Sequence, residues 1–406
     1  MEQKLDPHQY ERKLESMIRS IEKSEISERN KKLIFRFKDD CIRDGLSKPR
    51  ITKLMEIMKA SALIFDKDFD KVNRKDVERF ITLIQQRDYS IWTKQSYKVI
   101  VKKFFKWYKG IDGEFPDEVK WIKCTVKKSQ LKLPTQEGLI TEEDLKLLVK
   151  EAKNPRDKAF ISLLYESGCR VSELLTLRIK NVSFDEYGAL LNVFGKTGSR
   201  KIRIIGSTSY LVTWLHNHPF KDDNDSALWI NYGQKGYNKP MMYGTTRTML
   251  QKLFKKCKIK KRHNPHLFRH SRATYLANHL TEFQMNQYFG WVQGSGMPAT
   301  YVHLSGRETD SALLALSGIR KDEEKKESLL KPIKCTRCEN LNSYDAKFCS
   351  KCAGILDIQT AMQLEDKRQK ENEMRKESDE IMNKLMRDPE VMKLITEKIA
   401  IMGLNK

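Results

Sequence analysis

Four of the eight cysteines form two Cys-x-x-Cys pairs, and this spacing restricts the fold of the C-terminal region more than any other feature. Cys335 and Cys338 are followed, after a spacer of ten residues, by Cys349 and Cys352. Such pairs supply four thiolates for one tetrahedral zinc ion. A pair of disulfides is the alternative, and it fits poorly with an intracellular protein. Because cysteine would fill all four positions, we expect a structural zinc rather than a catalytic one.

The charge of the chain favours a polyanionic partner. The net charge is +23 and the sequence pI is near 9.5, which indicates nucleic acid first and an acidic membrane surface second. No stretch approaches the ~18 consecutive apolar residues that a membrane span needs, and the charged start does not resemble a signal peptide. We expect a cytoplasmic, nucleoid-associated protein with no membrane contact. At ~150 residues per domain, it has two or three domains.

Residues 1–117 predict a helical domain. The segment from Ser27 to Gly45 is typical of a helix followed by a left-handed glycine. Ser47-Lys48-Pro49 predicts the start of another helix, and apolar spacing predicts two more over 74–86 and 92–109. The last of these mixes lysines with aromatic residues, which fits either a DNA-facing helix or an ordinary amphipathic helix with a solvated basic face. The lysines are Lys94, Lys98, Lys102, Lys103 and Lys106.

The rest of the chain predicts a second domain and two appended segments. A basic linker over 118–136 leads to a domain over 137–318, where Thr141 and Asp144 indicate a helix N-cap. Two apolar segments around Gly195-Lys196-Thr197-Gly198 predict a β-hairpin among the helices of this domain. A charged linker (319–333), the zinc ribbon (334–356) and a helical tail (357–406) follow.

The predicted fold class is mainly α with a small β-sheet (α+β). In the tail, Asp388-Pro389 predicts a break between two amphipathic helices. Packing of the tail against a partner helix or a second copy, and packing on the parent protein, remain open.

A short run in the second domain, Pro265-His266-Leu267-Phe268-Arg269-His270-Ser271-Arg272, carries the strongest functional signal. If the run is helical, His266 and Arg269 share one face, where an imidazole and a planar guanidinium suit a phosphate oxyanion. Upstream, Arg170 follows Gly168-Cys169, and Tyr301 lies about thirty residues downstream of the run. Together these residues are the parts needed to attack a DNA phosphodiester without a metal.

These motifs, in this order and spacing, resemble the tyrosine recombinase (phage integrase) family. The domain layout resembles the archaeal-type members with a C-terminal zinc ribbon. The resemblance implies that Arg170 and Arg269 clamp the scissile phosphate, with His266 beside them. It implies that Lys196, in the hairpin turn, protonates the leaving 5′ oxygen and that Tyr301 is the nucleophile.

Elementary chemistry supports these roles. A pentacoordinate phosphorane concentrates negative charge on its nonbridging oxygens, so fixed guanidinium donors stabilise it more than the ground state. A tyrosine with an ordinary pKa of about 10 is a weak nucleophile, so neighbouring cations must favour its phenolate. The 3′-phosphotyrosine product conserves the energy of the phosphodiester, so catalysis is expected to need no nucleotide cofactor and no metal.

Two further residues take roles from the resemblance. Trp291 follows Gly290 where many family members have a second histidine. Tryptophan occurs there in some active members, and its indole N–H can donate to the phosphate. Glu173 matches an acidic residue that buttresses an arginine and does not transfer protons.

The resemblance also implies an architecture and an assembly. Residues 1–117 would form a core-binding (DNA-binding) domain that makes a C-shaped clamp on double-stranded DNA with the catalytic domain (137–318). The family works as a tetramer on two DNA sites, through a Holliday junction. A short helix around Ser311 to Leu316 is our candidate for docking onto the neighbouring protomer. The zinc ribbon or the tail is the expected contact for a protein partner. The presence of both segments favours a mobile-element integrase.

Three alternatives remain open. A type IB topoisomerase uses the same side chains and would relax supercoils without joining two sites. A catalytically silent DNA-binding protein would keep the clamp but form no covalent adduct, and the intact set of residues argues against it. An interaction protein whose ribbon and tail recruit others is compatible with each of these. The target site, the choice among integration, excision and resolution, and the base-reading residues do not follow from the sequence.

Overall fold

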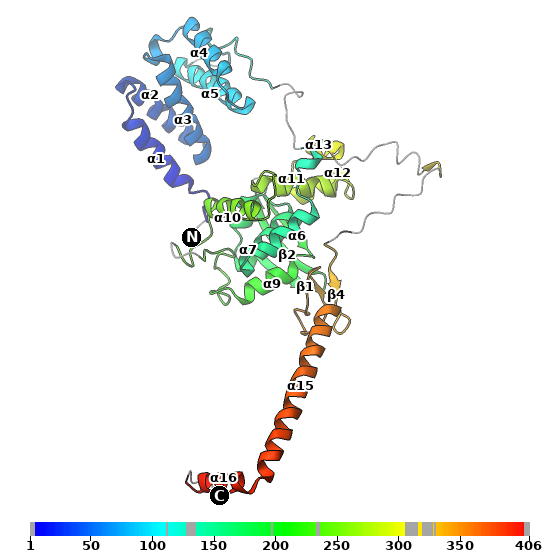
Figure 1. The fold of residues 1–406 in the computed structure, drawn as a ribbon. Helices are drawn as coiled ribbons and strands as arrows, with labels where there is room; N and C mark the ends of the chain where they lie inside the picture. The colour runs from blue at the N-terminus through cyan, green and yellow to red at the C-terminus, as the bar shows by residue number, and fades with distance from the viewer. Residues whose placement is uncertain are drawn as a thin grey trace. The chain divides into compact units, whose positions relative to one another are not determined.

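The computed structural model describes residues 5–110, 113–126, 135–195, 198–232, 236–304, 316–318, 328 and 330–401. The chain divides into two compact units (Figure 1). Unit 1 comprises Met1–Leu139 and Lys239–Thr248, and unit 2 comprises Ile140–Asn238 and Met249–Lys406. The described residues are mainly helical with two small antiparallel sheets, which confirms the predicted fold class. None of the described helices is long and apolar enough to cross a membrane.

The N-terminal helices of unit 1 begin and end where local chemistry predicts. The Ser27 hydroxyl caps the second helix by accepting a hydrogen bond from the Asn30 N–H at 3.2 Å, and Gly45 after that helix has a φ of 73°. Pro49 lies in the first turn of the third helix, where its missing N–H has no intrahelical partner to lose. The two helices predicted from apolar spacing are also present. The bounds are α1 (Tyr10–Glu22), α2 (Glu28–Arg43), α3 (Lys48–Phe65), α4 (Arg74–Gln86) and α5 (Ile91–Lys109), with a 3-10 turn η1 (Phe69–Lys71).

Helix α5 separates an apolar face from a basic one. Its Phe104 and Phe105 are fully buried in the core of unit 1, where Phe104 packs edge-on against Phe37 with ring centroids 5.3 Å apart. The five lysines of α5 before Lys109 are half-buried, and some of their ammonium groups bind nearby backbone carbonyls, as Lys94 does at 2.7 Å and Lys102 at 3.1 Å. Part of the basic face therefore stabilises the fold of unit 1.

Unit 2 begins with the predicted capping box. The Thr141 hydroxyl accepts from the Asp144 N–H at 3.2 Å, and the Asp144 carboxylate accepts from the Thr141 N–H at 3.0 Å. Every residue of the second helix from Ala159 to Tyr165 is buried, and this helix packs against three others. Helix α10 (Tyr243–Lys256) begins in unit 1 and continues in unit 2 from Met249. The other bounds are α6 (Glu142–Glu151), α7 (Pro155–Ser167), α8 (Val171–Leu175), α9 (Thr208–His216), α11 (Pro265–Leu276), α12 (Glu282–Phe289) and α13 (Met297–Leu304).

The predicted hairpin is present and belongs to a three-stranded antiparallel sheet. Strands β1 (Val182–Asp185), β2 (Gly188–Gly195) and β3 (Gly198–Ile204) follow one another in order. The register pairs Leu191 with Ile202, both fully buried, so the apolar alternation of the two strands sets their pairing. Strand β1 was not predicted, because its short sequence has mostly exposed side chains and no strong alternation.

The paired cysteines lie in a small module within unit 2 that contacts α9. Strands β4 (Ile333–Lys334) and β5 (Leu341–Asn342) pair within it. The Ser343 N–H donates to the Ser209 hydroxyl at 3.0 Å, and the Tyr210 hydroxyl binds the Asp345 carboxylate. Two tail helices follow, α15 (Ile358–Arg387) and α16 (Pro389–Ile401), which confirms the predicted break.

Candidate active site

The first candidate arginine stands at a sharp change of chain direction. Helix α7 ends at Ser167 and is followed by Gly168, whose φ of 54° suits glycine; a Cβ there would lie 2.6 Å from the Phe289 ring. Arg170 precedes α8, where its N–H donates to Oε2 of Glu173 at 3.0 Å and its Nη1 donates to Oε1 at 2.9 Å. The Arg170 side chain is 30% exposed and the Glu173 side chain only 2%. A buried carboxylate therefore holds a guanidinium that still reaches solvent.

A second arginine, which sequence reasoning missed, binds the same carboxylate. Arg200 on β3 donates from Nη2 to Oε2 of Glu173 at 2.7 Å and from Nη1 to Oε1 at 3.2 Å, and its Nε donates to the Tyr288 carbonyl at 2.9 Å. Burial alone would raise the pKa of Glu173, but the hydrogen bonds and charge of Arg200, with the hydrogen bonds of Arg170, lower it overall. Strand alternation could have found this arginine, because it shares the inward face of β3 with Ile202.

Helix α11 carries the second candidate arginine in a buried position. The Asn264 side chain caps the helix by accepting from the Leu267 N–H at 3.0 Å. Arg269 is 5% exposed, and it donates from Nη1 to the Gly168 carbonyl at 2.9 Å and from Nη2 to the Phe289 carbonyl at 2.7 Å. Burial, with the nearby charge of Arg170, lowers the pKa of Arg269 to about 10. The guanidinium therefore remains a fixed cation at neutral pH.

Two histidines flank Arg269 on α11. Nδ1 of His270 lies 2.8 Å from the hydroxyl oxygen of Tyr301, and the two groups share a hydrogen bond. His266, one turn earlier, is exposed. Partial loss of water around the ring lowers the pKa of both, and the charges of Arg269 and Arg170 add to this effect at His266. Sequence reasoning chose His266 and missed His270, whose only signal is its place directly after the arginine.

Tyr301 on α13 is held by stacked rings and is 2% exposed. Its ring stacks on Trp291 with centroids 5.4 Å apart and 5° between the planes, and Trp291 stacks on Phe289 at 4.8 Å. Burial raises the pKa of Tyr301, and the charge of Arg269 opposes this shift only in part. The phenol is therefore protonated at neutral pH in this structure.

The candidate residues converge on Arg269. Its guanidinium lies 5.4 Å from the ring centroid of Trp291, which stacks on Tyr301. The charge of Arg269 acts on the pKa of His266 and of Tyr301. The charge of Arg170 acts in turn on the pKa of Arg269. The structure therefore brings five of the six predicted catalytic residues together with the predicted support, Glu173.

The sixth, Lys196, lies outside the described residues. The residue before it, Gly195, is the last of β2 and pairs with Gly198. A Cβ at Gly195 would clash with Oε1 of Glu173. The end of strand β2 therefore lies directly beside the carboxylate that holds both Arg170 and Arg200.

The four paired cysteines also come together. Their Sγ atoms all lie within 4.8 Å of one another, and two Sγ pairs are 3.5 and 3.7 Å apart. Thiolates around a zinc with bonds of about 2.3 Å are separated by roughly 3.8 Å. The two Cys-x-x-Cys turns share a backbone geometry, because Glu339 and Ala353 have φ near 59° and 55° and donate to the first cysteine carbonyl of their turn at 2.9 Å. These atoms fit one tetrahedral metal ion. The residues are Cys335, Cys338, Cys349 and Cys352.

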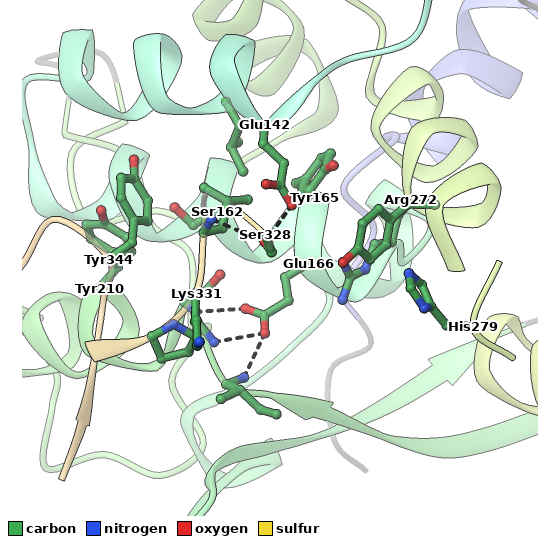
Figure 2. Close-up of a pocket in the computed structure, with 17 residues that line it drawn as sticks. Glu142, Ser162, Tyr165, Glu166, Tyr210, Arg272, His279, Ser328, Lys331 and Tyr344 are labelled. Carbon is green, nitrogen blue, oxygen red and sulfur yellow. Dashed lines mark hydrogen bonds between the residues drawn. The ribbon is translucent and has the colours of Figure 1, made fainter. Parts of the chain in front are cut away.

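A cavity of about 460 Å³ elsewhere in unit 2 has a different lining (Figure 2). Its lining residues include none of the predicted catalytic side chains. The Glu166 carboxylate beside it accepts hydrogen bonds from the N–H groups of Ile205, Gly206 and Ser207 at 2.7, 2.9 and 2.7 Å, so it fixes the turn between β3 and α9. The cavity therefore does not coincide with the candidate active site.

Comparison with known proteins locates the same region. The model of the phage integrase family matches residues 139–308, a span that contains all six predicted catalytic residues. The tyrosine recombinase XerA of Pyrococcus horikoshii is 29% identical over 213 residues, which cover 52% of this chain and 70% of that protein. A tyrosine recombinase of Pseudothermotoga lettingae is 26% identical over 252 residues, covering 61% of this chain and 84% of the relative.

Solved structures share the fold. The XerH site-specific recombinase bound to palindromic difH substrate, in a post-cleavage complex, aligns with a TM-score of 0.54 and 17% identity over 76% of this chain and 95% of that one. A lambda integrase dimer bound to a COC′ core site aligns with a TM-score of 0.54 and 13% identity over 68% of this chain and 78% of the other. The fold and the sequence matches define a DNA strand-transferring enzyme. Residues 139–308 form a domain of the phage integrase family, and the curated relatives that the chain resembles are tyrosine recombinases.

Proposed function

We propose that this chain is a site-specific DNA recombinase that cleaves and rejoins strands through a 3′-phosphotyrosine bond at Tyr301. The observation that carries the proposal is the convergence of Arg170, His266, Trp291 and Tyr301 on the buried guanidinium of Arg269. Fixed cations beside a protected tyrosine suit an in-line attack on a phosphodiester, whose charge grows in the transition state.

In this proposal, the two candidate arginines bind the nonbridging oxygens of the scissile phosphate. Arg269 is anchored by two backbone carbonyls and Arg170 by Glu173, so neither guanidinium has to reorganise when the phosphorane forms. His266 is exposed beside them and donates to the same phosphate. These contacts stabilise the transition state more than the ground state because the oxygens carry more charge there.

Lys196 supplies the proton that the leaving 5′ oxygen needs. A lysine ammonium is a flexible donor, and the hairpin that bears it starts beside Glu173. Trp291 orients the nucleophile through its stacked ring, and its indole N–H serves as a further donor to the phosphate. Resealing reverses the same steps and conserves the bond energy, so the proposal requires no nucleotide.

We also propose that the four-cysteine cluster binds a structural zinc ion. Zinc would fix the two Cys-x-x-Cys turns, and the segment between them carries Ser343, which contacts α9. The Asn342 side-chain N–H donates to Sγ of Cys349 at 3.7 Å, an outer contact of the kind that orients metal-bound thiolates. The ion has no role in strand transfer, because four thiolates fill its coordination sphere.

On DNA, the chain acts as a homo-oligomer, a tetramer that joins two sites. The charge of +23 supplies the phosphate contacts, so log K should fall with log salt at a slope of about −0.9 per neutralised phosphate. We assign the DNA contacts to residues 1–117 and 137–318, which the basic linker 118–136 joins. We assign contacts with protein partners to residues 334–356 and 357–406, which follow the charged linker 319–333. The predicted docking helix over Ser311 to Leu316 lies, except for Leu316, outside the described residues.

A two-site assay tests this proposal against a topoisomerase. Purified protein is incubated with DNA selected for binding, placed either once or twice on a negatively supercoiled plasmid. Exchange between two copies of the site, lost with Tyr301→Phe, supports recombination. Relaxation of the one-site and the site-free plasmid alike, with no exchanged product, contradicts recombination and favours a topoisomerase.

A further inference from the structure

The contact between His270 and Tyr301 has no role in the chemistry described so far. Nδ1 of His270 lies 2.8 Å from the hydroxyl oxygen of Tyr301, and the ring centroids are 5.8 Å apart with 34° between the planes. The two residues come from different helices, α11 and α13, which pack on each other. The hydroxyl thus has a ring nitrogen within ordinary hydrogen-bond distance.

The tyrosine needs a proton acceptor at this point. Its phenol is buried against Trp291. The charge of Arg269 lowers its pKa, but not enough to bring it down to its ordinary value. A protonated phenol attacks phosphorus slowly, so its proton has to leave as the bond to phosphorus forms. A neutral imidazole at hydrogen-bond distance is the group best suited to accept it.

We propose that His270 is a catalytic residue, the general base that takes the proton of Tyr301 as the tyrosine attacks the scissile phosphate. This inference rests on the proposed function. The Oη–H bond breaks and the proton moves to Nδ1 of His270, while the Oη–P bond forms. The bond from phosphorus to the 5′ oxygen breaks, and that oxygen takes a proton from the Lys196 ammonium. In resealing, the 5′ hydroxyl gives its proton back to Lys196 as its oxygen bonds to phosphorus, and His270 returns its proton to Tyr301 as the Oη–P bond breaks.

The surroundings of His270 keep it in the form that accepts a proton. The groups that act on its charge are His266 and Arg269 on its own helix, and it faces Tyr301 on α13. Burial first, and then the two neighbouring side chains, lower the pKa of His270 below its usual value of 6.5. The imidazole is therefore neutral at physiological pH, with one ring nitrogen free to accept.

His266 is placed for a different task. It lies one turn earlier on α11, is exposed, and is subject to the charges of both Arg170 and Arg269. Those two guanidiniums mark the proposed position of the phosphate. The helix therefore presents one histidine to the phosphate and the other to the nucleophile, with Arg269 between them.

The test measures covalent adduct formation against pH on a nicked duplex recovered by trapping from a randomised pool. Asparagine can place an oxygen near the position of Nδ1, so His270→Asn keeps an acceptor for the tyrosine but cannot take its proton. We expect this variant to bind DNA as wild type does and to form adduct at least ~100-fold more slowly. The wild-type rate should rise with pH through the His270 pKa, below about 6.5, and the variant should lack this rise.

Two comparisons separate the roles. His266→Asn should lower the rate by a similar factor at every pH and keep the rise. A sulfur at the 5′ bridging position of the scissile phosphate leaves without needing a proton. This substrate should therefore restore the rate of adduct formation in Lys196→Ala but not in His270→Asn.

Wild-type rates and an unchanged pH profile in both His270→Asn and His270→Ala would overturn the inference while leaving Tyr301 as the nucleophile. Absence of adduct from wild type itself would overturn the proposed function, and the inference with it.

Discussion

Arg200 and Glu173 form a two-point ion pair beneath the candidate phosphate clamp, with N–O distances of 2.7 and 3.2 Å. Both side chains are almost fully buried, at 9% and 2% exposure. Because Glu173 also binds Arg170 at 2.9 Å, one carboxylate links strand β3 to the first candidate arginine. The pair thus connects β3 with α8.

Removing Arg200 should therefore weaken both the fold and the reaction. In Arg200→Ala, a buried carboxylate loses one of its two cations, and we expect a loss of about 3 kcal/mol in the free energy of unfolding, measured with urea. Adduct formation should slow while DNA affinity changes little. Arg203→Ala on the same strand is the matched control, since Arg203 pairs with Asp185 at 35% exposure and should change neither quantity much. Equal behaviour of the two variants would contradict the assigned role of Arg200.

The free energy of unfolding at acid pH should depend on the ionisation of Glu173. Its folded-state pKa is lowered by Arg200 and Arg170 against the effect of burial. A lowered carboxyl pKa contributes stability that is fully present above the unfolded value of about 4.5 and is lost as pH falls through the folded value. Glu173→Gln should thus be less stable than wild type at neutral pH and show a shallower loss below pH ~4.5. If the urea midpoints of wild type and Glu173→Gln changed in parallel across this pH range, the result would be inconsistent with a lowered pKa of Glu173.

Much of the site could be predicted because its residues lie in motifs of local structure. Gly168 ends a helix in a left-handed conformation directly before Arg170, and Pro265 starts the helix that carries His266 and Arg269. Such helix ends are determined by neighbouring residues, so a single sequence reveals them. The β-hairpin was predictable for the same reason, since its glycines and strand alternation are local.

The remaining contacts depend on pairs far apart in the sequence. Arg200 meets Glu173 across 27 positions, and His270 meets Tyr301 across 31. A single sequence gives the spacing of such residues but not which of two neighbouring histidines faces the tyrosine. The stacking of Trp291 on Tyr301 was likewise unforeseen, because the resemblance suggested only a contact with phosphate.

A side chain at Gly195, the residue before the proposed catalytic lysine, should disturb the site. A Cβ at Gly195 would clash with Oε1 of Glu173 and lie 3.3 Å from Nη1 of Arg200. We expect Gly195→Ala to displace the carboxylate and slow adduct formation by tenfold to on the order of a hundredfold. Gly244→Ala on α10 is the control, since a Cβ there meets nothing within 4 Å. A fully active Gly195→Ala protein would show that the position of Glu173 does not matter to catalysis.

Metal loss should disorder the ribbon without stopping strand cleavage. Cys349→Ser removes a proposed zinc ligand, so the purified variant should release less than the one zinc per chain expected of wild type, and its ribbon should become sensitive to protease. Cys257→Ser replaces a single cysteine outside the cluster and should keep its zinc. Both should still form the tyrosine adduct. Full zinc content in Cys349→Ser would refute the ligand assignment.

The central claim is that Tyr301 becomes joined to DNA. Wild-type protein and Tyr301→Phe are incubated with nicked duplexes that trap the cleaved strand, with and without EDTA, and adducts are separated in SDS and digested for peptide mapping. The account predicts an adduct that forms equally in EDTA, is absent from the variant, and maps to the peptide containing Tyr301. An adduct that survives Tyr301→Phe, or maps to another residue, would contradict it.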